Sequence, residues 1–109
     1  MWILRTDAEA QAGPFTFRLM PGVSKTLGRA GRADFIVDVA MVSRVHCRLT
    51  VADGQLRVDD LNSTNGTFVN ERRVDGAALA AGDRLRVGRL ELVVSDGSYL
   101  DRDSAPDPA

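Results

Sequence analysis

The sequence is poor in the side chains that most catalytic and metal sites need. Its 109 residues include one histidine and one cysteine, the neighbours His46 and Cys47. A single cysteine excludes an internal disulfide, and one histidine with one cysteine cannot supply the ligand set of a structural zinc site. Neighbouring side chains on a strand point to opposite faces, so the two cannot act as nucleophile and base. We therefore expect no catalytic residues and no metal, and we interpret Cys47 as a buried structural thiol.

Long apolar runs and an excess of one charge are also missing. The 14 basic and 15 acidic residues give a net charge of −1, which argues against a general nucleic-acid-binding protein. No apolar run is long enough for a transmembrane helix, and residues 1–5 reach a charge before an apolar core, unlike a secretory signal. The stretch Gly28-Arg29-Ala30-Gly31 lacks the spacing and the following helix of a nucleotide-binding loop. We expect a cytoplasmic protein without a cofactor that binds neither nucleic acid nor membrane.

The charges divide the chain into two unequal parts. Residues 1–95 hold 13 basic and 11 acidic side chains, whereas residues 96–109 hold four aspartates and one arginine. The second part has little to bury, so we interpret residues 96–109 as an acidic, disordered tail or linker. The first part is long enough to bury a core of its own. The sequence thus predicts one domain over residues 1–95.

Alternation of apolar and polar residues dominates that domain. The pattern covers residues 15–20, 55–59, 84–87 and 89–94. Each such segment predicts a strand with one dry face and one wet face, and Asp53-Gly54 between two of them predicts a tight hairpin. No window has a sustained helical stripe, although residues 75–81 could hold one helical turn. Many short strands with frequent turns predict an all-β sandwich or barrel.

Three loop segments carry residue types that suit one ligand, an anion. They are Thr26–Arg29, Val42–His46 and Leu61–Thr67. Arginine matches the geometry of phosphate oxygens, and hydroxyl, amide and exposed backbone N–H groups can complete an anion site. Taken singly, each segment has a simpler interpretation: a solvated arginine, a hydrogen-bonded structural histidine, and an ordinary turn with positive φ at Asn65-Gly66. From residues alone, the chain is a β-domain with one possible anion-binding end.

The order and spacing of these segments resemble a known family. The motifs are Gly28-Arg29, Ser43-Arg44-x-His46, Asn62-Ser-Thr-Asn65-Gly66-Thr67, Val69-Asn70 and Gly82-Asp83-x-Leu85. Together they resemble forkhead-associated (FHA) domains, from about Trp2 to Ser95. The resemblance implies a twisted β-sandwich of two sheets and about eleven short strands, with binding loops at one end. It also implies a non-catalytic module that binds phosphothreonine in extended segments of proteins phosphorylated by Ser/Thr kinases.

Carried over by position, the family pattern implies a role for each matching residue. Ligand contacts would come from Arg29, Ser43, Arg44, Thr64 and Asn65. Arg29 would hold the phosphate with help from the Ser43 hydroxyl and Thr64, Asn65 would hold the peptide backbone, and Arg44 would reach the phosphate or an acidic neighbour. Support of the loops would come from Gly28, His46, Asn62 and Gly66. Arg32, Arg72 and Arg73 are interpreted as solvated charges, with peptide contact as the alternative.

A second function stays open at this point. The same sandwich could be a phosphate-independent interaction or oligomerisation domain, which would still bind its partner after phosphatase treatment. We expect a monomer or a weak dimer.

Overall fold

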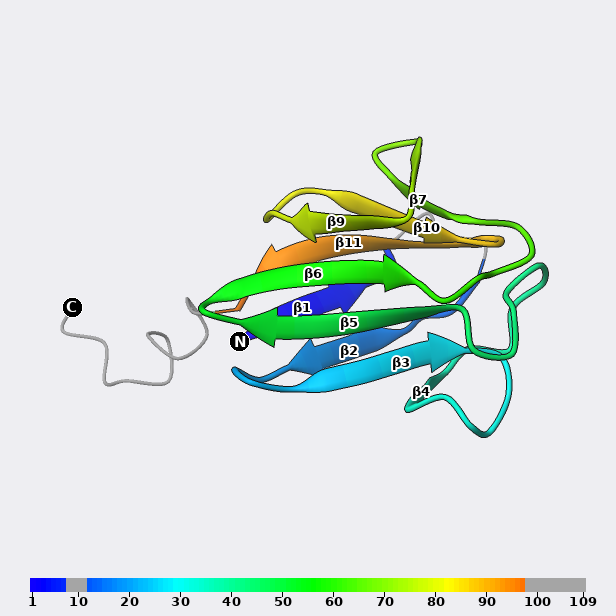
Figure 1. The fold of residues 1–109 in the computed structure, drawn as a ribbon, viewed down its shortest axis with the longest axis horizontal. Coiled ribbons are helices and arrows are strands. Elements are labelled where there is room, and N and C mark those ends of the chain that lie inside the picture. The colour runs from blue at the N-terminus through cyan, green and yellow to red at the C-terminus, as the bar shows by residue number, and fades with distance from the viewer. Residues whose placement is uncertain (8–11, 98–109) are drawn as a thin grey trace, which may run out of the picture.

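The computed structural model describes residues 1–7 and 12–97, and in these residues it contains eleven short strands and no helix. The strands are β1 (Trp2–Arg5), β2 (Thr16–Leu19), β3 (Ser24–Gly28), β4 (Phe35–Ile36), β5 (Cys47–Ala52), β6 (Gln55–Asp60), β7 (Thr67–Val69), β8 (Arg72–Val74), β9 (Gly76–Leu79), β10 (Arg84–Val87) and β11 (Leu90–Asp96). Figure 1 shows them as two layers.

The two layers are a six-stranded and a five-stranded sheet. The first has the order β2-β1-β11-β10-β7-β8, and the second has the order β4-β3-β5-β6-β9. Their strands pair antiparallel, apart from the short parallel pair of β3 and β4. The all-β sandwich predicted from the alternation is confirmed.

The core lies between the sheets and follows from the alternating pattern. On β10 and β11 the paired residues Leu85 and Leu92 are fully buried, while the next pair, Arg86 and Glu91, is on the outer face. The second sheet contributes Leu49 and Val58 in the same manner. Because side chains alternate between faces, one apolar residue in two is enough to form a continuous core.

The predicted hairpin at Asp53-Gly54 is confirmed. It joins β5 to β6, and both residues have positive φ, 53° and 76°, as a type I′ turn requires. The helical turn considered for residues 75–81 is wrong, because Gly76–Leu79 forms strand β9 along β6. Alanine favours a helix locally, but a ladder with β6 and the burial of Leu79 outweigh that preference.

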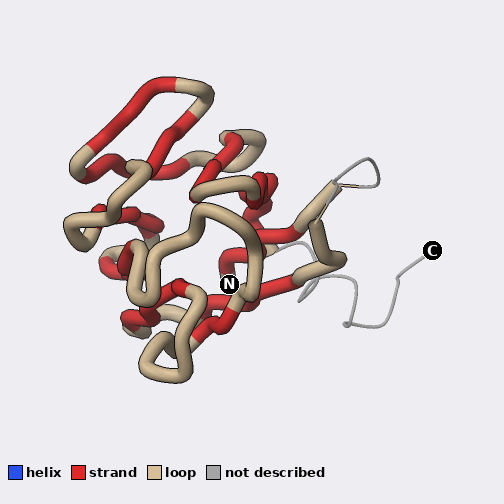
Figure 2. Tube along the Cα trace, turned by 90° about the vertical axis from the view of Figure 1, so that its right-hand side faces the viewer, coloured by secondary structure: helices blue, strands red, loops and turns tan. Residues whose placement is uncertain are grey.

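The start of β1 and the end of β11 lie at one end of the sandwich, opposite the three loops that carry the candidate ligand contacts (Figure 1). The first and last strands are neighbours, and the Gly97 N–H donates to the Met1 carbonyl oxygen at 2.6 Å. The expected acidic tail lies, from residue 98 onward, outside the described residues. The β3–β4, β4–β5 and β6–β7 loops are at the other end, which faces the viewer in Figure 2.

Candidate functional site

Backbone hydrogen bonds hold the first two of these loops together. The Arg29 N–H donates to the Ser43 carbonyl at 2.9 Å, and the Ala30 N–H donates to the Arg44 carbonyl at 3.1 Å. Residues fourteen positions apart in sequence thus become neighbours. The structure therefore brings together Arg29, Ser43 and Arg44, three of the residues expected to contact the ligand.

Gly28 permits this close approach. A Cβ atom built at Gly28 would overlap the carbonyl group of Arg44 and come 2.8 Å from the Cα of Val45, all of them backbone atoms. Backbone cannot move aside as the tip of a side chain can, so only glycine fits where β3 ends. The position expected to support the loops is thus the one where they are packed most tightly.

His46 joins the second loop to the third. It is fully buried, its Nδ1 accepts the Ser43 N–H at 3.0 Å, and its Nε2 is 2.8 Å from the Gly66 carbonyl oxygen. Nδ1 must be the acceptor here, so the proton is on Nε2, which donates to Gly66. A neutral imidazole of one tautomer therefore links the Ser43 backbone to the Gly66 backbone.

A carboxylate below the third loop fixes its shape. Asp60 accepts the N–H and the hydroxyl of Ser63, at 3.1 and 2.5 Å, and the hydroxyl of Thr67 at 2.7 Å. The Ser63 oxygen in turn accepts the Gly66 N–H at 3.0 Å. Burial raises the pKa of Asp60, but the hydrogen bonds from Ser63 and Thr67 outweigh it, so the net pKa lies below the ordinary value of 3.8.

Ser43 and Thr64 meet where the second and third loops touch. The Thr64 N–H donates to the Ser43 hydroxyl oxygen at 3.0 Å. That bond occupies a lone pair of the hydroxyl and leaves its proton to donate elsewhere. Ser43 is thus oriented by the protein and still has a donor for an incoming anion.

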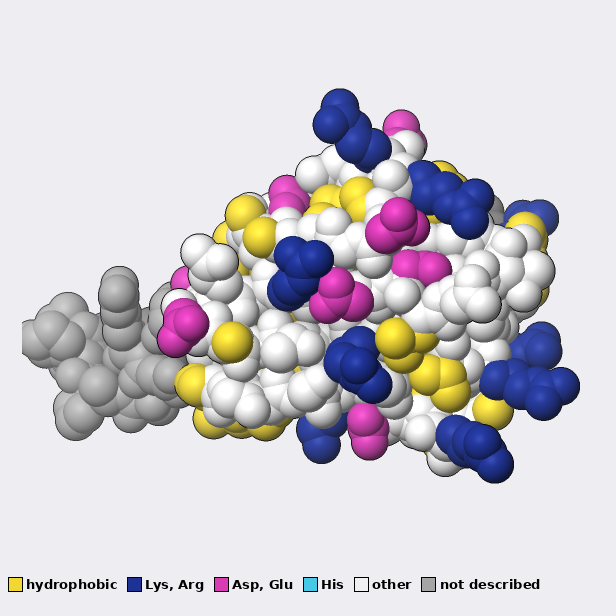
Figure 3. Space-filling model, viewed as in Figure 1, with side chains coloured by type: hydrophobic (Ala, Val, Ile, Leu, Met, Phe, Trp, Pro, Cys, Tyr) yellow, Lys and Arg dark blue, Asp and Glu magenta, His cyan; other side chains and the backbone are white. Residues whose placement is uncertain are grey.

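The remaining candidate contacts are open to solvent. Arg29, Arg44 and Thr64 are exposed, and neither arginine takes part in an ion pair within the described part of the chain. Lys and Arg side chains gather at this end of the face seen in Figure 3. Guanidinium groups without an ion pair, on the loops that also carry an oriented hydroxyl, provide donors suited to a phosphate group.

Asn65 is engaged within the protein. Its side-chain N–H donates to the carbonyl oxygen of Met41 at 3.0 Å, and Met41 is an exposed residue with a φ of 69°. The amide oxygen of Asn65 accepts no hydrogen bond from the described residues. Because the amide nitrogen has two N–H donors, one donor and the amide oxygen remain for a peptide backbone while the bond to Met41 is kept.

The left-handed residues in the third loop are not the expected pair. Gly66 has a φ of 89°, but the other residue with positive φ is Asn62, at 58°, rather than Asn65. The residue before it, Leu61, is fixed by a hydrogen bond from its N–H to the His46 carbonyl oxygen at 3.0 Å, and the loop begins at Asn62. It is exposed and reverses the chain into Ser63, in keeping with a loop-shaping position.

Three contributors were missed by sequence reasoning: Met41, Asp60 and Ser63. The spacing of Asp60 and Ser63 is that of a side chain capping a turn three residues on, and this pattern could have revealed the pair. Nothing in the sequence marks Met41, because it contributes its carbonyl group rather than its side chain.

The interpretation of Cys47 as a buried thiol is confirmed. Its side chain is fully buried at the start of β5, and burial raises its pKa to about 12. Such a thiol stays protonated and unreactive at neutral pH. Among residues 1–7 and 12–97, no group of three or more His, Cys, Asp or Glu side chains could hold a metal ion. The same residues include no helix suited to crossing a membrane.

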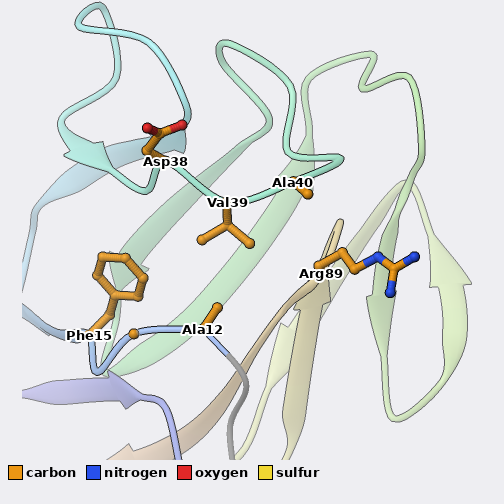
Figure 4. Close-up of a pocket in the computed structure, with 7 residues that line it drawn as sticks. Ala12, Phe15, Asp38, Val39, Ala40 and Arg89 are labelled. Atoms are coloured by element: carbon orange, nitrogen blue, oxygen red, sulfur yellow. The ribbon is translucent and has the colours of Figure 1, made fainter.

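A separate pocket is lined in part by residues 38–40 of the β4–β5 loop. It has a volume of about 390 Å³ and is bounded by Ala12, Phe15 and Val39, with Asp38 and Arg89 on either side (Figure 4). It includes none of the residues expected to contact phosphate. The candidate site is therefore a surface formed by loops and not this pocket.

Comparison with known proteins agrees with this geometry. A sequence model of the FHA domain matches residues 25–88. The chain is 36% identical over 83 residues to the glycogen accumulation regulator GarA of Mycolicibacterium smegmatis, covering 76% of this chain and 52% of that protein. It is 38% identical over 91 residues to the ABC transporter ATP-binding/permease protein Rv1747 of Mycobacterium tuberculosis, covering 84% of this chain and 10% of that protein. The chain thus spans about half of one relative and a tenth of the other.

Solved structures show the same relationship. A structure from an analysis of phosphothreonine-dependent FHA domain interactions superimposes with a TM-score of 0.77 at 35% identity, over 87% of this chain and 95% of that one. The FhaA FHA domain in complex with the intracellular domain of Rv3910 gives a TM-score of 0.76 at 35% identity, over 86% and 99%. Sequence motifs, sheet topology and loop geometry lead to one conclusion: this chain belongs to the FHA domain family.

Proposed function

We propose that this chain is a non-catalytic module that binds phosphothreonine in partner proteins of Ser/Thr kinase signalling, in the cytoplasm. The observation that carries the proposal is the Ser43 hydroxyl, oriented by the Thr64 N–H, on joined loops that also present the exposed Arg29 and Arg44. Phosphothreonine has a charge of about −1.5 to −2 at neutral pH and three acceptor oxygens. Two guanidinium groups, a hydroxyl and loop N–H groups can satisfy those acceptors without a metal.

Rigidity supports the same conclusion. The loops that carry the donors are held by the bonds of His46 and Asp60, so binding does not have to order these loops first. Preorganised donors lose less free energy on binding than mobile ones. We propose that the two groups of residues act together, Arg29, Ser43, Arg44, Thr64 and Asn65 on the ligand and Gly28, His46, Asn62 and Gly66 behind them.

Titration with fluorescent peptides tests this function. Peptides with threonine, phosphoserine or phosphothreonine at one position are titrated and followed by fluorescence anisotropy. Binding should require the phosphate, and phosphothreonine should be favoured over phosphoserine only by the one methyl group, worth about 1–3 kcal/mol. Binding to none of these peptides by the folded protein would contradict the proposal, and release of phosphate from the peptide would contradict its non-catalytic part.

A matched pair of arginine variants tests the site. Arg29→Ala should weaken binding of the phosphothreonine peptide by about 30-fold or more, because losing one partner of a desolvated charge pair costs about 2–5 kcal/mol. Arg32→Ala removes the same charge from an exposed position in the same loop and should change affinity by less than about threefold. Equal effects of the two variants would show that Arg29 acts only through net charge.

A further inference from the structure

A row of three side chains crosses the outer face of the six-stranded sheet beside the third loop. Phe68 on β7 lies directly opposite Arg73 on β8 and Arg86 on β10. Residues paired in this way have their side chains on one face, in contact. The guanidinium carbon of Arg86 is 4.2 Å from the centroid of the Phe68 ring. We call Arg73, Phe68 and Arg86 the arginine row.

The arginine row touches the candidate phosphate site. A Cβ atom built at Gly66 would lie 2.9 Å from the Nε of Arg73 and 3.3 Å from the Phe68 ring. The guanidinium of Arg73 therefore lies against the backbone of Gly66, whose carbonyl group accepts the bond from His46. A peptide that leaves the phosphate site across Gly66 meets this row next.

Glu91 lies opposite Arg86 on the neighbouring strand, but its carboxylate pairs with Arg84 and not with the row. Arg84, on the same strand as Arg86, forms ion pairs with Asp7 at 3.1 Å and Glu91 at 2.6 Å. Neither Arg73 nor Arg86 has an ion pair within residues 1–7 and 12–97. The Phe68 ring holds the Arg86 guanidinium in place, and a guanidinium fixed in this way loses less freedom when it binds a carboxylate.

We propose that the arginine row is a specificity subsite that recognises an acidic side chain flanking the phosphothreonine. The proposal rests on the proposed function, since the phosphate anchors the peptide beside Gly66. Each extended residue spans about 3.3 Å, so a carboxylate within a few residues of the phosphothreonine reaches the row. Arg73, interpreted from sequence as a solvated charge, becomes a ligand contact.

A glutamate scan tests the subsite. A phosphothreonine peptide with alanine at all other positions is compared with peptides in which one glutamate moves through both flanks. Wild type should bind one or two of these about three- to fivefold more tightly, as expected for partly exposed ion pairs, and the gain should shrink as salt is added. Arg73→Gln and Arg86→Gln should each reduce the gain without changing affinity for the alanine peptide.

Arg72→Gln is the matched control. Arg72 is the neighbour of Arg73 on β8, is also exposed, and points to the opposite face of the strand, so its loss should leave the glutamate gain intact. If wild type binds no phosphothreonine peptide, the proposed function itself is wrong. If it binds the alanine peptide but glutamate gives no gain at any position, or the gain survives in both arginine-row variants, only the subsite is wrong. An equal loss for every peptide in Arg73→Gln would also overturn the subsite.

Discussion

A single carboxylate, Asp60, supports the third loop from below although it does not face the ligand. It accepts three hydrogen bonds from Ser63 and Thr67 and thereby orients the Ser63 oxygen toward the Gly66 N–H. Asp59, its neighbour, instead forms an exposed ion pair with Arg57 at 3.0 Å on the outer face. Two adjacent aspartates thus have different roles because a strand turns them to opposite sides.

Replacing each aspartate by asparagine should separate these roles. In Asp60→Asn an amide N–H faces donors where a carboxylate oxygen accepted them, so unfolding free energy should fall by about 1–3 kcal/mol and phosphopeptide affinity should fall with it. Asp59→Asn should change stability by less than about 0.5 kcal/mol. Urea unfolding and anisotropy titration provide both measurements, and equal losses in the two variants would contradict this assignment.

Acid should abolish the difference in unfolding free energy between wild type and Asp60→Asn. Since the folded state lowers the pKa of Asp60 below 3.8, the stabilisation is present above that pH and is lost as the pH falls through the folded pKa. Urea unfolding of both proteins from neutral pH downward should show two curves that converge below about pH 4. A gap that stays constant would mean that Asp60 acts through packing and not through its charge.

At this scale the sequence predicted some roles and not others. Adjacent, alternating positions were enough to infer a buried Cys47, and the motif was enough to single out His46. The sequence could not show that the Asp60 carboxylate meets both Ser63 and Thr67, because that depends on how the loop after β6 folds over the end of the strand. Nor could it show that Asn65 is bonded to Met41, a contact between loops 24 residues apart.

At the scale of the element, the end of strand β3 determines whether the first two loops can meet. Gly28 is packed against the Arg44 carbonyl group, whereas Gly31, in the loop that follows, has no atom within 4 Å of a built Cβ and no positive φ. The same substitution at these two glycines therefore probes two different situations, contact with rigid backbone and open space.

Gly28→Ala should destabilise the protein by about 1–3 kcal/mol and weaken phosphopeptide binding, because the two loops must separate to admit the methyl group. Gly31→Ala should be neutral or stabilise the fold by up to about 1 kcal/mol, through reduced freedom of the unfolded chain. Thermal unfolding and anisotropy titration of both variants measure this contrast. A stable, fully binding Gly28→Ala protein would show that the close approach is not needed.

The elements differed in how well they could be predicted. The strict alternation of apolar and polar residues predicted β10 and β11, because a strand is the element that buries every second side chain. Strand β9 was missed because Ala77 and Ala78 show no alternation of apolar and polar residues. This segment is extended because it pairs with β6. The backbone reversals at Met41 and Asn62 were missed because neither follows a two-residue turn pattern.

At the scale of the whole molecule, the pairing between the first and last strands ends at the end of β11. The ladder with β1 pairs Asp96 with Trp2, and the Gly97 N–H bonds to the Met1 carbonyl one step further on. The last strand thus extends one residue past the boundary at residue 95 expected from charge and composition. We propose that residues 1–97 form the complete folding and binding unit.

A chain shortened after residue 97 should keep the stability and the phosphothreonine affinity of the full chain. Unfolding free energies should agree within about 0.5 kcal/mol, as expected for changes away from the core. A second truncation after residue 92 removes Val94 and all four β11 residues that pair with β1, and should unfold the protein. Loss of phosphopeptide binding in the chain shortened after residue 97 would show that residues 98–109 take part in recognition.

The start of β1 and the end of β11 lie far from the binding loops, and this separation has a geometric consequence (Figure 1). Two copies fused through these ends by a short linker would direct their loops away from each other. Such a tandem could not engage two phosphates on one short peptide, so it should gain little avidity on a doubly phosphorylated segment. It would instead hold two separately phosphorylated proteins at opposite poles, which makes this arrangement suited to bridging rather than to clamping.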